Sequence, residues 1–120
     1  MNAALLARDA YGASTRAIRT PRSEEYDAFA RITSAMRKAV TFSEKTASAN
    51  LNRRLWTLLA TDLVSDQNEL PRDLRASLLS LAEFTNQYTS KILRGEAEIS
   101  VLIDINTTVM AGLRQQGSSE

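Results

Sequence analysis

Apolar residues recur along this chain at spacings of three and four, which is the spacing of one face of an α-helix. Four segments carry the pattern: Tyr26, Phe29, Thr33, Met36 and Val40; Leu51, Leu55, Leu58 and Leu59; Leu74, Leu78, Leu81, Thr85, Tyr88 and Ile92; and Ile99, Leu102, Ile103, Asn106, Val109, Met110 and Leu113. No run alternates convincingly with the period of two that is typical of a strand. The pattern therefore predicts an all-α fold.

Two prolines and one glycine mark the ends of these helices. Thr20-Pro21 is typical of an N-cap followed by the first helical position. Pro71 ends a turn that leads into another helix, and Gly95 is typical of a helix C-terminus. The pattern leaves open whether 42–49 is a break or continuous helix, with Ser43 and Ser48 as alternative caps for a helix that starts there.

The two ends of the chain are less regular. A stripe of mostly small residues within 1–19 predicts a helix that is stable only when it docks on something. Residues 115–120 carry no periodic signal and are expected to form a flexible tail. We therefore expect one domain over 1–114, a bundle of about four or five helices with antiparallel neighbours. Its oligomeric state is open between a monomer and a dimer that exchanges the first helix.

The composition limits the chemistry. The 120 residues include no cysteine and no histidine, which excludes disulfides, thiolate zinc sites and histidine-based catalysis. The formal net charge of +1 is too small for a nucleic-acid-binding surface or an electrostatic membrane anchor. We find no secretory signal and no apolar run long enough to span a membrane. These features predict a cytoplasmic protein that is not an enzyme and has no cofactor and no metal.

Two chemical interpretations are weaker than their structural alternatives. The carboxylates that could act as a catalytic pair or bind a metal are Glu24, Glu25, Glu96, Glu98, Asp62, Asp66 and Glu69, but their spacing favours solvated charges. Arg53 and Arg54 beside Trp56 combine basic charge with an aromatic ring, as in some nucleic-acid sites. These three positions point in different directions on a helix, which favours two exposed arginines and one packed tryptophan.

Two helices carry wider apolar faces than one packing partner requires. The candidate partner-binding residues on these faces are Leu55, Trp56, Leu59, Leu63, Val101, Leu102, Ile105 and Val109. A helix buried between two neighbours would show the same width, so core and groove stay open as alternatives. Asp62 and Asn106 lie in or beside these faces, and we expect each to have a structural hydrogen bond or salt bridge, for example to an arginine.

Several segments, in order, resemble one bacterial family, the flagellar protein FlaF family. They are Tyr11-Gly12, Pro21-Arg22 with Glu25, Asn52-Arg53-Arg54-Leu55-Trp56-Thr57, Asn68, Leu70-Pro71, Leu74-Arg75, Leu102-Ile103-Asp104-Ile105-Asn106 and Gly112-Leu113. The resemblance runs over nearly the whole chain, although 33–49 and the tail after Leu113 carry little of it.

The resemblance implies a helical cytoplasmic protein that binds flagellin. It further implies a flagellin export chaperone and positive regulator of flagellin synthesis, with the companion regulator FlbT as a second partner. The alternative is a post-transcriptional regulator that acts on flagellin mRNA through FlbT or RNA and is not a chaperone. The resemblance brings no catalytic residue with it.

Overall fold

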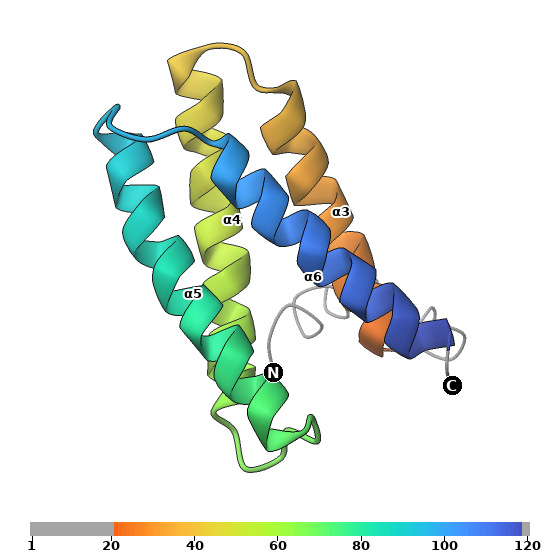
Figure 1. Cartoon of the computed structure of the whole chain (residues 1–120). Helices are drawn as coiled ribbons and strands as arrows, with labels where there is room; N and C mark the ends of the chain where they lie inside the picture. The colour runs from red at the N-terminus through yellow and green to blue at the C-terminus, as the bar shows by residue number, and fades with distance from the viewer. Residues whose placement is uncertain (1–20, 119–120) are drawn as a thin grey trace.

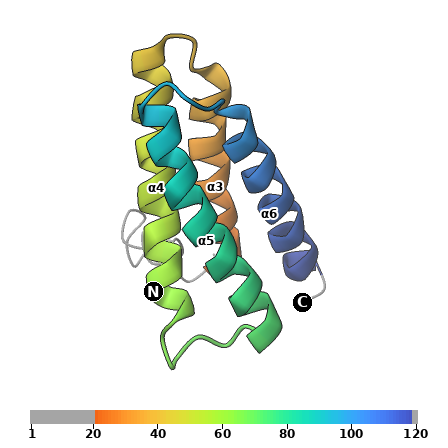
Figure 2. The same ribbon diagram turned by 60° about the vertical axis from the view of Figure 1, so that its left-hand side comes forward.

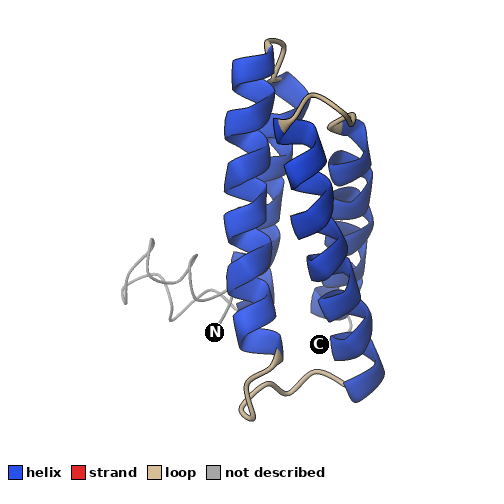
Figure 3. Cartoon of the chain, turned by 90° about the vertical axis from the view of Figure 1, so that its left-hand side faces the viewer, coloured by secondary structure: helices blue, strands red, loops and turns tan. Residues whose placement is uncertain are grey.

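Four α-helices make up most of the computed structural model, which describes residues 21–118. They are α3 (Pro21–Lys38), α4 (Phe42–Leu63), α5 (Arg72–Leu93) and α6 (Ser100–Ser118), shown in Figure 1. No strand occurs in this part of the chain (Figure 3). The predicted all-α fold is confirmed, and the helix expected over 1–19 lies outside the described residues.

The helices form two closely packed antiparallel pairs. α3 packs along α6, and α4 packs along α5, while α3 also packs on α4 less extensively; Figure 2 shows α5 and α6 on adjacent sides of the bundle. The connections 39–41 and 94–99 lie at one end of the bundle, and the loop 64–71 between α4 and α5 lies at the other (Figure 3).

A capping box starts α4. The Thr41 side chain accepts a hydrogen bond from the Glu44 backbone N–H at 3.1 Å, and the Glu44 carboxylate accepts from the backbone N–H groups of Thr41 and Val40. These backbone donors, Thr41 first, hold the pKa of Glu44 below its ordinary value. The break therefore falls before Phe42, and the cap is Thr41 rather than Ser43 or Ser48. The signal was the Thr-x-x-Glu spacing of residues 41–44.

Gly95 ends α5, as predicted. Its φ is +75°, a conformation that glycine adopts without the penalty of a Cβ. The Gly95 N–H donates to the carbonyl of Ile92, and the Glu96 N–H donates to that of Lys91, both at 2.9 Å. These two bonds are the pair that defines a Schellman motif.

The buried side chains fall into two apolar clusters. Cluster 1 consists of Ala28, Phe29, Leu55, Trp56, Leu59, Leu63, Ala82 and Met110. Cluster 2 consists of Met36, Ala49, Ile92, Ile99 and Leu102. Two residues of the predicted stripes, Val40 and Leu51, are exposed instead. Leu51 is exposed because α4 directs Ser48, Ala49 and the adjacent Asn52 toward the core.

The C-terminal helix is longer than the sequence pattern indicated. α6 continues to Ser118, so 115–118, predicted to begin a tail after residue 114, is helical in the structure. The lack of apolar periodicity there did not stop the helix, since its two glutamines have high intrinsic helix propensity.

Replacing each of two glycines by alanine should change stability in opposite directions. Gly95→Ala should destabilise the fold by about 1 kcal/mol, because an alanine at positive φ is strained. The cost is conformational, since a Cβ there would meet only Phe42 Cε1, at 3.9 Å. Gly112→Ala, in the interior of α6 with nothing within 4 Å of the added Cβ, should stabilise the fold by about 0.5–1 kcal/mol. Urea unfolding of both variants measures the difference, and an equal effect of the two would contradict the assigned C-cap.

Candidate functional site

Five of the eight candidate residues lie in the core. Leu55, Trp56, Leu59 and Leu63 belong to cluster 1 and Leu102 to cluster 2, each at most 4% exposed. The wide apolar face of α4 therefore packs between α3 and α5, which is the core alternative that the sequence left open. Whether any of these side chains contacts a partner stays a prediction.

The other three candidates are half-buried on α6. Val101, Ile105 and Val109 follow one another at spacings of four, so they share one side of the helix. Ile105 and Val109 pack against the edge of cluster 1, where the half-buried Leu78 and Leu81 of α5 also pack. We call Leu78, Leu81, Ile105 and Val109 the α5/α6 strip. These four are half-buried apolar side chains that pack against the same cluster, and they come from two helices without extensive contact with each other.

Between the two clusters lies a layer of buried polar side chains. Thr33 of α3, Asn52 of α4 and Asn106 of α6 are fully buried, as are Thr85 and Thr89 of α5. On every helix these residues stand between one member of cluster 1 and one of cluster 2 along the chain. The core is thus split into two apolar halves by a polar layer, to which each described helix contributes.

Asn106 is the centre of this layer. Its Oδ1 accepts a hydrogen bond from Trp56 Nε1–H at 3.0 Å. Its Nδ2 donates to Thr33 Oγ1 at 3.0 Å and to Asn52 Oδ1 at 2.7 Å. The predicted structural hydrogen bonding of Asn106 is confirmed, although the partners are an indole, a hydroxyl and an amide rather than an arginine. The sequence pattern did not predict the burial of Asn52, because it assigned the adjacent Leu51 to the buried stripe.

Trp56 is fixed from two sides. Its ring packs edge to face against Phe29, with ring centroids 5.5 Å apart. Its indole N–H donates to Asn106 Oδ1. At 1% exposure it offers no platform for a nucleic-acid base, which confirms the expected packed tryptophan. Arg53 donates to Ser90 Oγ and Asn50 Oδ1, so its guanidinium helps to join α4 to α5.

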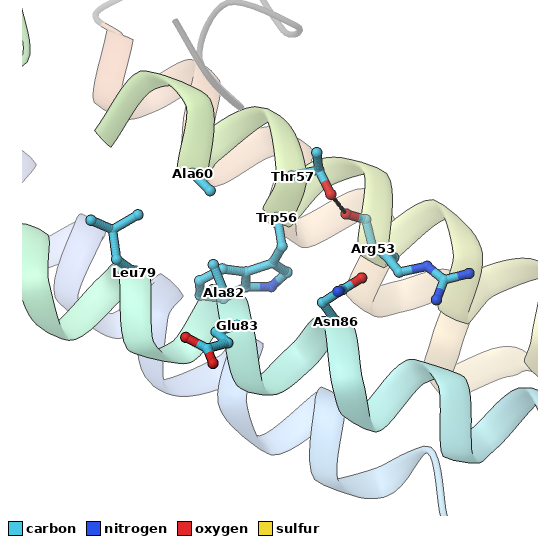
Figure 4. Close-up of a pocket in the computed structure, with 8 residues that line it drawn as sticks. All are labelled: Arg53, Trp56, Thr57, Ala60, Leu79, Ala82, Glu83 and Asn86. Atoms are coloured by element: carbon cyan, nitrogen blue, oxygen red, sulfur yellow. Dashed lines mark hydrogen bonds between the residues drawn. The ribbon is translucent and has the colours of Figure 1, made fainter. Parts of the chain in front are cut away.

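An open hollow of about 240 Å³ lies between α4 and α5, and Figure 4 shows its lining. Its lining includes the Trp56 ring and the small side chains of Ala60 and Ala82. Arg53 and Glu83 are the charged residues of the lining. The hollow is a gap between two closely packed helices.

The acidic residues within 21–118 do not gather into a metal-binding group. Within the described part of the chain, no three aspartates or glutamates come close enough to hold an ion. Asp62, the candidate nearest the apolar face, accepts a hydrogen bond from Asn68 Nδ2 at 2.8 Å. Among residues 21–118, no helix is long and apolar enough to cross a membrane.

Removing the carboxamide of Asn106 should destabilise the bundle strongly. Asn106→Ala leaves the Trp56 N–H buried without an acceptor, and we expect a loss of about 3 kcal/mol. Asp104→Ala, an exposed position on the same helix, should change stability by less than about 0.5 kcal/mol. Urea unfolding followed by circular dichroism compares them. Equal losses in the two variants would show that the network contributes little.

The family model for flagellar protein FlaF matches residues 7–113. No curated protein and no solved structure matches the chain. The matched region contains α3, α4 and α5 complete, the polar layer and both apolar clusters. Because the family model covers most of the sequence, this chain belongs to the flagellar protein FlaF family.

Proposed function

We propose that this chain is a cytoplasmic flagellin-binding protein, which acts as an export chaperone and positive regulator of flagellin synthesis. Membership of the FlaF family supports a role in the flagellum, and the sequence resemblance suggested flagellin as the partner. The observation that carries the binding role is the α5/α6 strip, where apolar side chains from two helices remain partly accessible. The proposed role requires no catalytic step.

The strip suits an amphipathic helix as its ligand. Ile105 and Val109 are one turn apart on α6, and Leu78 and Leu81 are one turn apart on α5, all at the edge of cluster 1. A partner helix with apolar anchors at spacings of three and four matches the spacing of these side chains on each helix. Flagellin ends that are not yet polymerised are helices of this kind, and covering them would keep an aggregation-prone surface from water.

The charge of the chain supports an apolar contact over RNA binding. The net charge of +1 provides little attraction for a phosphate backbone. The buried ring of Trp56 also leaves out the aromatic stacking that single-stranded RNA sites use. The complex with flagellin should therefore survive moderate salt.

Mixing the purified chain with flagellin monomer tests the proposed function. The two should co-elute from a size-exclusion column at micromolar concentrations, and the complex should persist when the salt is raised. If they elute separately, the chaperone role fails and regulation through FlbT or RNA becomes the stronger hypothesis.

A polar substitution in the α5/α6 strip should weaken the complex selectively. Ile105→Ser removes an apolar anchor, and we expect the dissociation constant to rise about tenfold, equivalent to about 1.4 kcal/mol. Val64→Ser is the matched control, since Val64 is an apolar residue that is already 66% exposed and lies outside the strip. Titration calorimetry measures both, with circular dichroism to verify that Ile105→Ser is folded. An unchanged affinity in a folded Ile105→Ser variant would place the contact elsewhere.

A further inference from the structure

We call the two closely packed helix pairs the two leaves of the bundle. One leaf is α3 with α6 and the other is α4 with α5, the two helix pairs in most extensive contact. Between the leaves, α3 packs on α4 less extensively, and α5 and α6 have no comparable contact. The two leaves are therefore in less extensive contact between α5 and α6 than between α3 and α4.

Both described connections between the leaves lie at the same end of the bundle. The turn 39–41 joins α3 to α4, and 94–99 joins α5 to α6, beside cluster 2 (Figures 1 and 3). The Tyr88 hydroxyl adds a tie there, donating to the Glu98 carbonyl at 2.8 Å. At the other end, beside cluster 1, the loop 64–71 stays within one leaf. Among residues 21–118, no covalent connection joins the leaves at that end.

Asn106 provides a polar tie between the leaves in the middle of the bundle. From α6 it bonds to Trp56 and Asn52, both on α4. The buried threonines of α5 take no part in this tie, because Thr85 and Thr89 donate to carbonyls of their own helix. In the closed form Asn52 Nδ2 is buried without an acceptor among the described residues. On opening, water can accept a hydrogen bond from Asn52 Nδ2 and can take over the hydrogen bonds of Asn106. The free energy of opening is therefore lower here than for a core in which every buried polar group already has a partner.

We propose that the bundle opens as two leaves, hinged at the end that holds 39–41 and 94–99, with the Asn106 carboxamide as the latch. Opening exposes Trp56 and the rest of cluster 1 while cluster 2 stays closed. An apolar helix from a partner then takes the place of the contacts between the leaves. This last step rests on the proposed function, whereas the opening is a property of the free chain.

Pairs of spin labels test the opening directly, because the chain has no natural cysteine. The labels replace exposed residues in the full-length protein. Ser80→Cys with Thr108→Cys spans the leaves near cluster 1, and Lys91→Cys with Ser100→Cys spans them at the hinge. Thr61→Cys with Ser80→Cys lies within one leaf, and Arg31→Cys with Thr108→Cys lies within the other.

Pulsed electron–electron double resonance on the labelled free chain gives the distribution of distances between the two labels of each pair. The Ser80/Thr108 pair should show a second, longer population, and the other three pairs should each show a single narrow one. Four equally narrow distributions would overturn the proposal. A broad distribution for a pair within one leaf would also overturn it, because the leaf would then not be rigid.

The latch is tested by Asn106→Leu in the Ser80/Thr108 background. This change keeps the side-chain size and removes all three hydrogen bonds, so the longer population should increase several-fold. Thr85→Val removes an equally buried hydroxyl of the same layer without touching the tie, and should leave the population unchanged. Equal increases in both variants would show that Asn106 is not the latch. If Asn106→Leu does not fold, as judged by circular dichroism, the unsubstituted distributions decide the proposal.

Addition of flagellin to the labelled chain separates this proposal from the proposed function. A shift of the Ser80/Thr108 pair to the longer distance would support both. An opening in the free chain that flagellin leaves unchanged would support the hinge and count against flagellin as the ligand.

Discussion

The carboxamide of Asn106 makes three hydrogen bonds at a site closed to water, and the position of α6 depends on them. A buried amide without partners would cost several kcal/mol, so α6 is held where Asn106 meets Trp56, Asn52 and Thr33. A slide of α6 by one turn would break all three bonds at once. The apolar clusters on both sides supply most of the burial, but they tolerate such shifts better than a directional network does.

The same polar layer divides the molecule into two halves that are connected in different ways. Cluster 2 lies beside two connections and the Tyr88 hydrogen bond, and it is the covalently tied end. Cluster 1 lies at the end where, among residues 21–118, no chain connection joins the leaves, and the residues of the α5/α6 strip pack against it. The proposed uptake of a partner helix would use this division, since one end could rearrange while the other preserves the fold.

The sequence predicted the helices well, because amphipathic periodicity and terminal residues such as Pro71 and Gly95 depend on local chemistry. Its error at Leu51 arose because an apolar stripe drawn by spacing alone prefers a leucine to the adjacent Asn52. The burial of Asn52 is explained only by its hydrogen bond with Asn106, which lies 54 positions away in the sequence. The choice between core and groove for Trp56 likewise depended on how α3 and α5 pack on α4, which no local pattern encodes. Membership of the FlaF family is carried by the sequence itself, and the family model confirms it over residues 7–113.

The exchange rate of the indole N–H of Trp56 tests the central claim most directly. Trp56 is the only tryptophan in the chain, so its indole proton gives one assigned signal in the nitrogen–proton NMR spectrum. The proton should exchange with water much more slowly than a free indole, because Asn106 accepts it in the core. It should nevertheless exchange faster than the most protected backbone amides, because opening of the leaves releases it without unfolding the helices. Exchange as fast as in the unfolded chain would contradict the buried tie between α4 and α6.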